Sequence, residues 1–310
     1  MKKGLLITSL AYFLWGFFPL YFKLLIEVPS MQILGHRIFW SFIFMSILLL
    51  LRHEWKPLFA KITRRTALVY FLAGLLLAVN WGTYVWSVNS GHVVEASLGY
   101  FINPLVSVLL GTLILREKLR MMQWIPIAIT AAGVLYLTLT YGAFPWISLV
   151  LAISFGLYGL VKKIAPFNPQ EGLFLETAMI VPPTLLYLIF CQVQGSGAFL
   201  HTSLHNNFLL VLSGIVTAIP LLMFAAGAHD VPLVTIGLLQ YIAPTIQFLI
   251  GVLIYHEAFT AEKLIGFSII WFALILFSAE SLLQVRRSHH LASATPPQPA
   301  YNAAGADPAE

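Results

Sequence analysis

The sequence predicts an all-α membrane protein in which ten transmembrane helices form two inverted five-helix repeats. Three observations predict it: the composition, ten long apolar runs, and a repeat at a constant offset of 140 residues, as from Gly16 to Gly156. Of the 310 residues, 59% are hydrophobic and only 9% are charged, whereas soluble proteins have roughly 25% charged residues. The mean hydropathy is +0.88. This composition is typical of a protein embedded in a membrane.

The apolar runs are long enough to cross a bilayer, since about 20 residues of helix span about 30 Å of hydrocarbon. Their apolarity is continuous rather than alternating, which favours helices over a barrel. The expected spans are residues 4–25, 31–51, 66–89, 92–115, 122–140, 144–162, 172–192, 206–227, 232–255 and 263–283. The first run is too long for the apolar core of a secretory signal and lacks a small-x-small cleavage pattern, so we keep it in the mature protein.

The distribution of lysine and arginine predicts the orientation. With a cytoplasmic N-terminus, 14 of the 17 Lys and Arg residues fall in cytoplasmic segments, only Lys263 falls in an outer connection, and Lys23 and Arg37 lie inside spans. Cytoplasmic loops are enriched in these residues, so we expect both termini in the cytoplasm. Residues 285–310 are rich in Pro and Ala and are expected to be a disordered cytoplasmic tail.

The repeat divides the chain into residues 1–143 and 144–284, each with five spans. Without any insertion, the offset pairs Gly16 with Gly156, Lys23 with Lys163, Pro29 with Pro169, Gly74 with Gly214, Pro104 with Pro244, Gly111 with Gly251, and Glu117 with Glu257. Because five is odd, the two halves must cross the membrane in opposite directions. Inverted repeats of this kind are typical of alternating-access carriers, whose substrate binds near the midplane between the halves.

Two prolines occupy matching positions in the repeat. Pro104 and Pro244 each lie about twelve residues into a predicted span, or about 18 Å along a helix. Each should kink its helix and free the carbonyl four residues earlier. Polar residues follow the same helical faces: Tyr100, Asn103, Ser107, Gln240 and Gln247. Polar side chains at this depth normally face a cavity or bridge helices, and we expect the set to line a cavity.

The other repeated pairs are expected to have structural or gating roles. Gly111 and Gly251 should permit close packing between helices. Glu117 and Glu257 lie where their spans end, and we expect them to cap helices or to make contacts at a gate. A solvated charge is the alternative for both glutamates.

Four stretches of the sequence are distinctive: NWGTYVWSVNSGHVVEASLGYFINPL (80–105), SFGLYGLVKK (154–163), HRIFWS (36–41) and GLLQYIAPTIQFLIG (237–251). They resemble the RarD proteins of the EamA family, within the drug/metabolite transporter superfamily. The resemblance covers the whole chain except the tail. It implies a ten-helix carrier of the bacterial inner membrane that exports small metabolites or drugs from a central cavity between its halves.

Charged residues inside predicted spans require partners, because each costs about 2.5–3.5 kcal/mol at the centre of a helix. Arg37 and Glu95 lie at similar depth on the outer side, so we expect them to form an ion pair. Glu176 enters its span from the cytoplasm and should act in the inner half, with Lys163 as its candidate partner. Ion pairs with a purely structural role are the alternative.

Three ionisable residues are candidate proton carriers: His36, Glu95 and Glu176. Buried carboxylates and imidazoles can change protonation near neutral pH. Lys23 shares a helical face with Trp15, which favours a place in the outer vestibule, although its side chain could also extend to the membrane interface.

The predicted substrate cavity combines the polar faces with aromatic and charged residues of the spans. Its members are Trp15, Lys23, Arg37, Asn80, Trp81, Tyr84, Glu95, Tyr100, Asn103, Ser107, Tyr158, Lys163, Gln240, Tyr241 and Gln247. Asn80 offers hydrogen bonds, and Trp81 and Tyr84 offer an aromatic wall. A structural role is the alternative for these three.

The sequence favours a secondary transporter over other classes of membrane protein. It has no H-E-x-x-H, phosphate-binding loop, Asp-rich diphosphate motif or cysteine cluster, so we expect no catalytic site, metal or cofactor. Its basic residues come in small clusters between apolar runs, which disfavours nucleic acid. The expected partners are a small-molecule substrate, the lipid bilayer and, for coupling, protons. An intramembrane enzyme acting on a lipid or isoprenoid is the alternative, and a channel is a third possibility.

Overall fold

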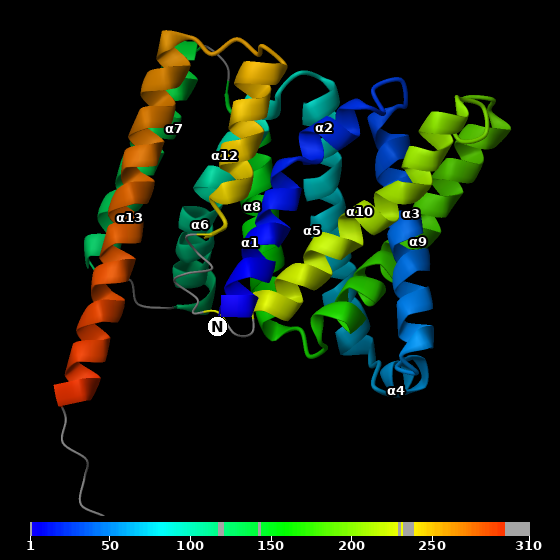
Figure 1. The fold of residues 1–310 in the computed structure, drawn as a ribbon, viewed down its shortest axis with the longest axis horizontal. Helices are drawn as coiled ribbons and strands as arrows, with labels where there is room; N and C mark the ends of the chain where they lie inside the picture. Colours follow the sequence, from blue (N-terminus) through cyan, green and yellow to red (C-terminus); the bar gives the residue numbers. More distant parts are fainter. Residues whose placement is uncertain (1, 117–120, 142–143, 229–230, 232–238, 295–310) are drawn as a thin grey trace, which may run out of the picture.

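The computed structural model describes residues 2–116, 121–141, 144–228, 231 and 239–294, and the described residues are helical with short connections (Figure 1). The helices are α1 Lys2–Gly16, α2 Phe18–Lys23, α3 Ser30–Leu51, α4 Trp55–Ala60, α5 Arg64–Asn89, α6 Val93–Leu115, α7 Met121–Tyr141, α8 Trp146–Ile164, α9 Pro169–Val193, α10 Leu204–Ala228, α12 Ile242–Leu249, the π-helix η1 Ile250–Ile254, and α13 Ala261–Ala294.

Seven helical segments are long and apolar enough to cross a membrane. They are Lys2–Lys23, Ser30–Leu51, Arg64–Asn89, Val93–Ile114, Pro169–Val193, Leu204–Phe224 and Ala261–Glu280. Each coincides with a predicted span. The other three predicted spans correspond to shorter apolar helices, at Trp124–Thr140, Trp146–Lys162 and Ile242–Ile254. The described chain is therefore an all-helical membrane protein with at least seven candidate spans.

The prediction of an uninterrupted helix over 232–255 is wrong. Gln240 and Tyr241 form a turn, and α12 begins at Ile242, so Pro244 lies in the first turn of a helix rather than in its middle. The first turn is where a missing N–H is tolerated, because those N–H groups have no partner within the helix. Pro104, by contrast, lies inside α6 as predicted.

Two further boundaries differ from the sequence analysis. The last helix continues to Ala294 instead of ending at residue 283, and residues 295–310 lie outside the described part. The first predicted span is divided at Phe17 into α1 and α2, with Pro19 near the start of α2. The short helix α4 was not predicted.

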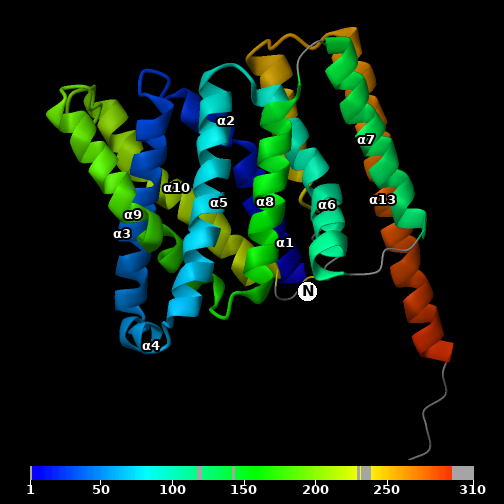
Figure 2. The same ribbon diagram turned by 180° about the vertical axis from the view of Figure 1, so that it is seen from behind.

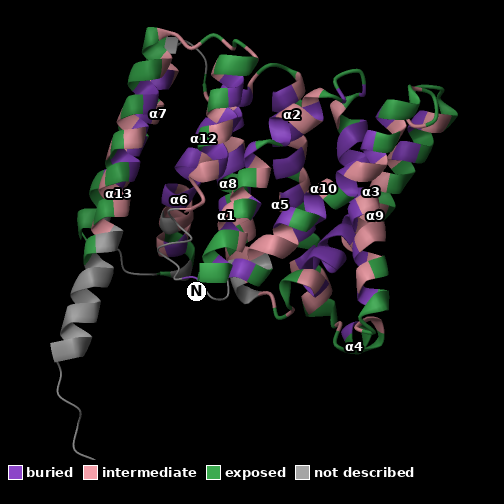
Figure 3. Ribbon diagram, in the orientation of Figure 1, coloured by how far each residue is buried: buried purple, intermediate pink, exposed green. Residues whose placement is uncertain are grey.

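The helices pack as an elongated bundle in which α7 and α13 lie side by side at one edge, and α3 and α9 lie at the other (Figures 1 and 2). Helix α5 packs on α8 and α9, while α10 packs on α1 and α3. Buried residues concentrate where these helices face one another, and exposed ones mark the outer faces of α7 and α13 (Figure 3). Many exposed residues are large and apolar, such as Leu186 and Leu139, as expected of a surface that contacts lipid.

Several tight contacts occur twice, at positions 140 residues apart. A methyl group on Gly16 would lie 2.8 Å from Ile246, and one on Gly156 would lie 3.3 Å from Val106. Gly16 and Gly156 are 140 residues apart, and so are Val106 and Ile246. The α1–α12 contact and the α6–α8 contact are therefore related by the offset of the sequence repeat.

A second pair of contacts obeys the same relation. A methyl group on Gly74 of α5 would lie 2.8 Å from Ile180 of α9, and one on Gly214 of α10 would lie 2.3 Å from the backbone of Trp40 in α3. The offset relates Gly74 to Gly214 and Trp40 to Ile180. A side chain would not fit at these distances, which explains why Gly16, Gly156, Gly74 and Gly214 lie at helix crossings.

Candidate functional site

Arg37 lies at the centre of an aromatic cluster formed by α2, α3 and α5. Its guanidinium carbon is 4.1 Å from the ring centroid of Trp81, 5.1 Å from that of Phe22 and 5.6 Å from that of Phe18. The side chain is buried, with 3% of the residue exposed. Its Nε donates to Oγ1 of Thr217 in α10 at 2.7 Å. Arg37 thus connects α2, α3 and α5, which belong to the first half of the sequence, with α10, which belongs to the second half.

A polar group of α5 borders this cluster. The amide nitrogen of Asn80 donates to the carbonyl of Leu151 at 3.0 Å and to Oγ of Ser154 at 3.1 Å. Its amide oxygen accepts from the hydroxyl of Tyr100 at 3.2 Å. The ring of Tyr100 in turn contacts that of Tyr84, with centroids 5.7 Å apart. Asn80 therefore holds α5, α6 and α8 together and positions two tyrosines.

The predicted ion pair between Arg37 and Glu95 is not formed. The carboxylate of Glu95 lies 3.8 Å from the ammonium of Lys263 and 3.7 Å from Nδ1 of His92, whereas Arg37 bonds to Thr217. Glu95 lies in the first turn of α6 and its side chain is 27% exposed. Arg37 and Glu95 were predicted to lie at similar depth in the membrane. They do not contact each other, because they face different helices.

Glu176 belongs to a second polar cluster, on α8 and α9. Its carboxylate accepts from Nζ of Lys162 at 2.7 Å and from the hydroxyl of Tyr158 at 3.1 Å. Lys163, the expected partner, is the next residue along the chain, and its side chain lies outside the described part. Lys162 also lies 5.6 Å from the ring centroid of Tyr70. Glu176 is therefore buried but neutralised.

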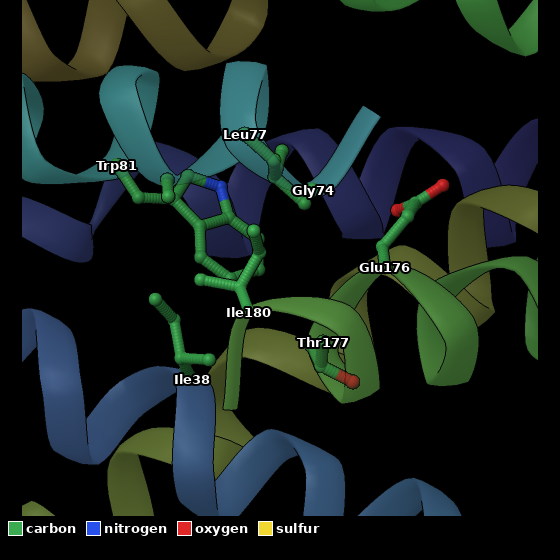
Figure 4. Close-up of a pocket in the computed structure, with 8 residues that line it drawn as sticks. Ile38, Gly74, Leu77, Trp81, Glu176, Thr177 and Ile180 are labelled. Carbon is green, nitrogen blue, oxygen red and sulfur yellow. The ribbon is translucent and has the colours of Figure 1, made fainter. Parts of the chain in front are cut away.

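A small cavity separates the two clusters (Figure 4). It has a volume of about 10 Å³, close to that of one water molecule. Glu176 and Ile180 of α9 line one side, and Trp81 of α5 and Ile38 of α3 line the other, with the indole of Trp81 pointing toward Ile180 (Figure 4). In this conformation, no substrate-sized space opens between these residues.

A larger pocket, of about 390 Å³, lies at the end of the bundle where α6 and α8 begin. Its lining includes the aromatic rings of Trp86 and Trp146 and the charged groups of Glu95, Glu257 and Lys263. Glu257 was expected to be a cap or gate contact, and its carboxylate accepts from the backbone N–H groups of Val93 at 2.7 Å and Val94 at 2.8 Å. It thereby caps α6; Glu117 lies outside the described residues.

The remaining members of the predicted cavity are distributed over several contacts. Gln247 donates to the carbonyl of Trp15 at 3.0 Å, and Ser107 donates to Asn103 at 3.5 Å. Tyr241 stacks on Phe101.

Lys23, Gln240 and His36 do not join the Arg37 contacts. Lys23 donates to the carbonyl of Val88 at 3.4 Å and lies 5.3 Å from the ring centroid of Tyr255. Gln240 lies in the turn before α12. His36 packs its ring against Phe199. The structure brings Arg37, Asn80, Trp81, Tyr84 and Tyr100 together, and Trp15 packs, as Tyr100 does, against the core cluster that contains Tyr84.

Four residues of the two clusters were missed. Phe18 and Phe22 resemble any lipid-facing aromatic residue of an apolar run, and no sequence signal distinguishes them. Lys162 is next to the predicted Lys163. Successive side chains of a helix point in directions about 100° apart, so adjacent residues face different neighbours. Thr217 could have been found, because it lies three residues after the repeated Gly214.

The chain is similar to transporters over nearly its whole length. The EamA-like transporter family matches residues 2–139. An uncharacterized transporter of Bacillus subtilis, YojE, is 48% identical over 93% of this chain and 97% of its own. Protein RarD of Streptomyces exfoliatus is 44% identical over 96% and 94%, and Protein RarD of Escherichia coli is 40% identical over 93% and 97%.

The fold is also similar to one already solved. A crystal structure matches with a TM-score of 0.59, covering 89% of this chain and 97% of the other at 17% sequence identity. At this identity the likeness concerns the fold alone.

Proposed function

This chain belongs to the RarD subfamily of the EamA-like transporter family, and we propose that it is a secondary transporter that exports small metabolites or drugs by alternating access. The substrate binds between two inverted five-helix halves, residues 1–143 and 144–284. The Arg37 cluster, to which both halves contribute, is the centre of the site. The comparisons favour transport over the enzymatic alternative, because the Bacillus subtilis relative is named a transporter and the matching family is that of EamA-like transporters.

The observation that carries the proposal is the set of duplicated contacts. Gly16 meets Ile246 as Gly156 meets Val106, with each residue replaced by its counterpart 140 positions away. The exchange also relates larger packing: α5 on α9 corresponds to α10 on α3, and α6 on α8 corresponds to α12 on α1. A bundle built this way can exchange the conformations of its halves and so expose one site to either side.

The orientation of the proposed transporter follows from its basic residues. The lower end in Figure 1 carries α4 and the start of α5. The segment 52–65, from the end of α3 to the start of α5, includes Arg52, Lys56, Lys61, Arg64 and Arg65. We place this end in the cytoplasm of a bacterial inner membrane. The pocket lined by Glu95 and Lys263 then faces the outside.

Counterflow in proteoliposomes distinguishes the three function classes. Vesicles containing the purified chain are loaded with an unlabelled compound and diluted into the same compound in labelled form, over a panel of metabolites and drugs. A carrier accumulates label transiently, a channel equilibrates without an overshoot, and an enzyme changes the compound chemically. Protein-free vesicles provide the baseline, and an imposed proton gradient tests coupling. If no compound in a broad panel shows an overshoot, the carrier mechanism is wrong.

A further inference from the structure

We infer that the substrate is a small organic anion with a flat apolar body, and that Arg37 binds its acidic group. The inference rests on the proposed transport function, to which it adds the chemical class of the cargo. Arg37 carries a buried charge that no acidic side chain neutralises within the described part of the protein: the described ion pairs, formed at up to 4.0 Å, do not include it.

The contrast with Glu176, another buried charge, is informative. Glu176, of which 1% is exposed, has the ammonium of Lys162 at 2.7 Å and the hydroxyl of Tyr158 at 3.1 Å. Arg37 is 3% exposed and has one hydrogen bond, from Nε to Thr217, while its Nη1 is buried without any partner. A buried charge normally requires a counter-ion. The protein supplies one to Glu176 and leaves the guanidinium available.

A second unused polar group lies near the guanidinium. The hydroxyl of Tyr84 is buried without a hydrogen-bond partner. The Phe22 ring contacts both residues: its centroid lies 6.2 Å from that of Tyr84 and 5.1 Å from the guanidinium carbon of Arg37. A guanidinium can only donate hydrogen bonds, and a tyrosine hydroxyl can donate one. Two free donors call for a ligand that accepts. A carboxylate is the natural match, because its two oxygens accept from the fork of an arginine.

The surroundings of these donors indicate the rest of the ligand. The rings of Phe18, Phe22 and Trp81 surround the guanidinium, and Tyr84 and Tyr100 continue the aromatic wall. Such walls bind flat apolar groups by stacking. A second charged or strongly polar group on the ligand would find no partner among these rings. The site therefore fits an aromatic or other compact apolar acid.

The site is closed in this structure. The neighbouring cavity has a volume of only about 10 Å³, so a ligand can enter only when α3, α5 and α10 separate. The bond from Arg37 of α3 to Thr217 of α10 links the two halves. An anion that engages the guanidinium competes with this bond, which gives the substrate a means of loosening the contact between the halves.

Binding of acids and of their neutral amides to the full chain in nanodiscs tests the inference. The probes are benzoate, 3-phenylpropionate and the permanently charged benzenesulfonate, each compared with its amide, together with phenyltrimethylammonium as a cation. Affinity is measured by calorimetry at pH 7.5 for the wild type, Arg37→Gln, Arg37→Lys and Tyr84→Phe. Arg52→Gln is the matched control, because it removes the same charge at the end of the same helix, where the side chain is exposed.

We expect at least one acid to bind the wild type and the Arg52→Gln variant equally, and its amide to bind neither. Arg37→Gln should weaken the binding of that acid by about 30-fold or more, Arg37→Lys by less, and Tyr84→Phe by about tenfold. Equal binding of amides, unchanged binding of acids to Arg37→Gln, or binding of no acid at all would overturn the inference. Counterflow of the cation or of the amides would then show that transport stands without an anionic substrate, whereas counterflow of no probe of any charge would count against the transport function itself.

Discussion

Arg37 lies with its guanidinium carbon 4.1 Å from the ring centroid of Trp81 and without an acidic partner within the described residues. An interaction of this kind contributes about 2 kcal/mol when it is shielded from water. Burying the charge costs several kcal/mol. The arginine is therefore expected to oppose stability in the empty protein.

Arg37→Met should leave the empty protein as stable as the wild type or more stable. Methionine fills part of the aromatic cluster without a charge. Replacing even a paired buried charge and its partner by apolar residues is often neutral or stabilising by about 1–4 kcal/mol, and Arg37 has no acidic partner within the described residues whose attraction would be lost. Thermal unfolding in detergent measures the change, and Arg52→Met, at the exposed end of the same helix, is the control. A large loss of stability in Arg37→Met alone would show that the arginine has a structural role.

The buried pair of Lys162 and Glu176 should behave in the opposite way. Lys162→Met leaves a carboxylate that is 1% exposed without its cation, and breaking such a pair costs about 3–5 kcal/mol. Combining Lys162→Met with Glu176→Gln removes both charges, so the double variant should lose less than the sum of the single variants. Additive losses in a double-mutant cycle would contradict the coupling.

The glycine at the α10–α3 crossing should tolerate no side chain. A methyl group on Gly214 would lie 2.3 Å from the backbone of Trp40, and a backbone atom cannot move away as a flexible side chain can. Gly214→Ala should therefore destabilise the protein or lower its folded yield. Gly159→Ala is the matched control, because a methyl group at Gly159 meets nothing within 4 Å and alanine favours helix by about 1 kcal/mol. Equal stability of the two variants would refute the close crossing.

Glu257 should stabilise the start of α6. Its carboxylate holds the N–H groups of Val93 and Val94 at the start of α6, and hydrogen bonds to a charged group each contribute about 1.5–3 kcal/mol. Glu257→Gln keeps one acceptor oxygen and loses the charge, and Glu257→Ala loses both. Amide hydrogen exchange at Val93 and Val94 should therefore increase from the wild type to Gln to Ala. Unchanged protection in the Ala variant would exclude the cap.

The positions of most helices could be predicted from the sequence, but most of the contacts between them could not. Apolar runs and turn residues fix where a helix such as α3 begins and ends within about two residues. The partner of Arg37 depends on which helix it faces, and depth in the membrane alone could not distinguish Thr217 from Glu95. The repeat carried more information, because the glycines it pairs, Gly74 and Gly214, lie at corresponding helix crossings.

A cavity should open beside the duplicated prolines, Pro104 and Pro244, while the protein transports its substrate. Asn103 and Gln247 are buried, with 7% and 4% of each residue exposed, close to Pro104 and Pro244 respectively. In the closed structure, neither position is open to a thiol reagent. Alternating access predicts that Asn103→Cys and Gln247→Cys, each in a chain that also carries Cys191→Ser, become reactive only while the protein cycles.

The two sites should respond to membrane-impermeant reagents added from either side of sealed vesicles, with rates that change when a transported compound is present. Leu49→Cys is the control, at a core position with 0% exposure. It should stay unreactive, and its labelling would indicate general unfolding. If both test positions resist labelling from both sides under every condition, no cavity opens at that depth, and alternating access between these halves is wrong.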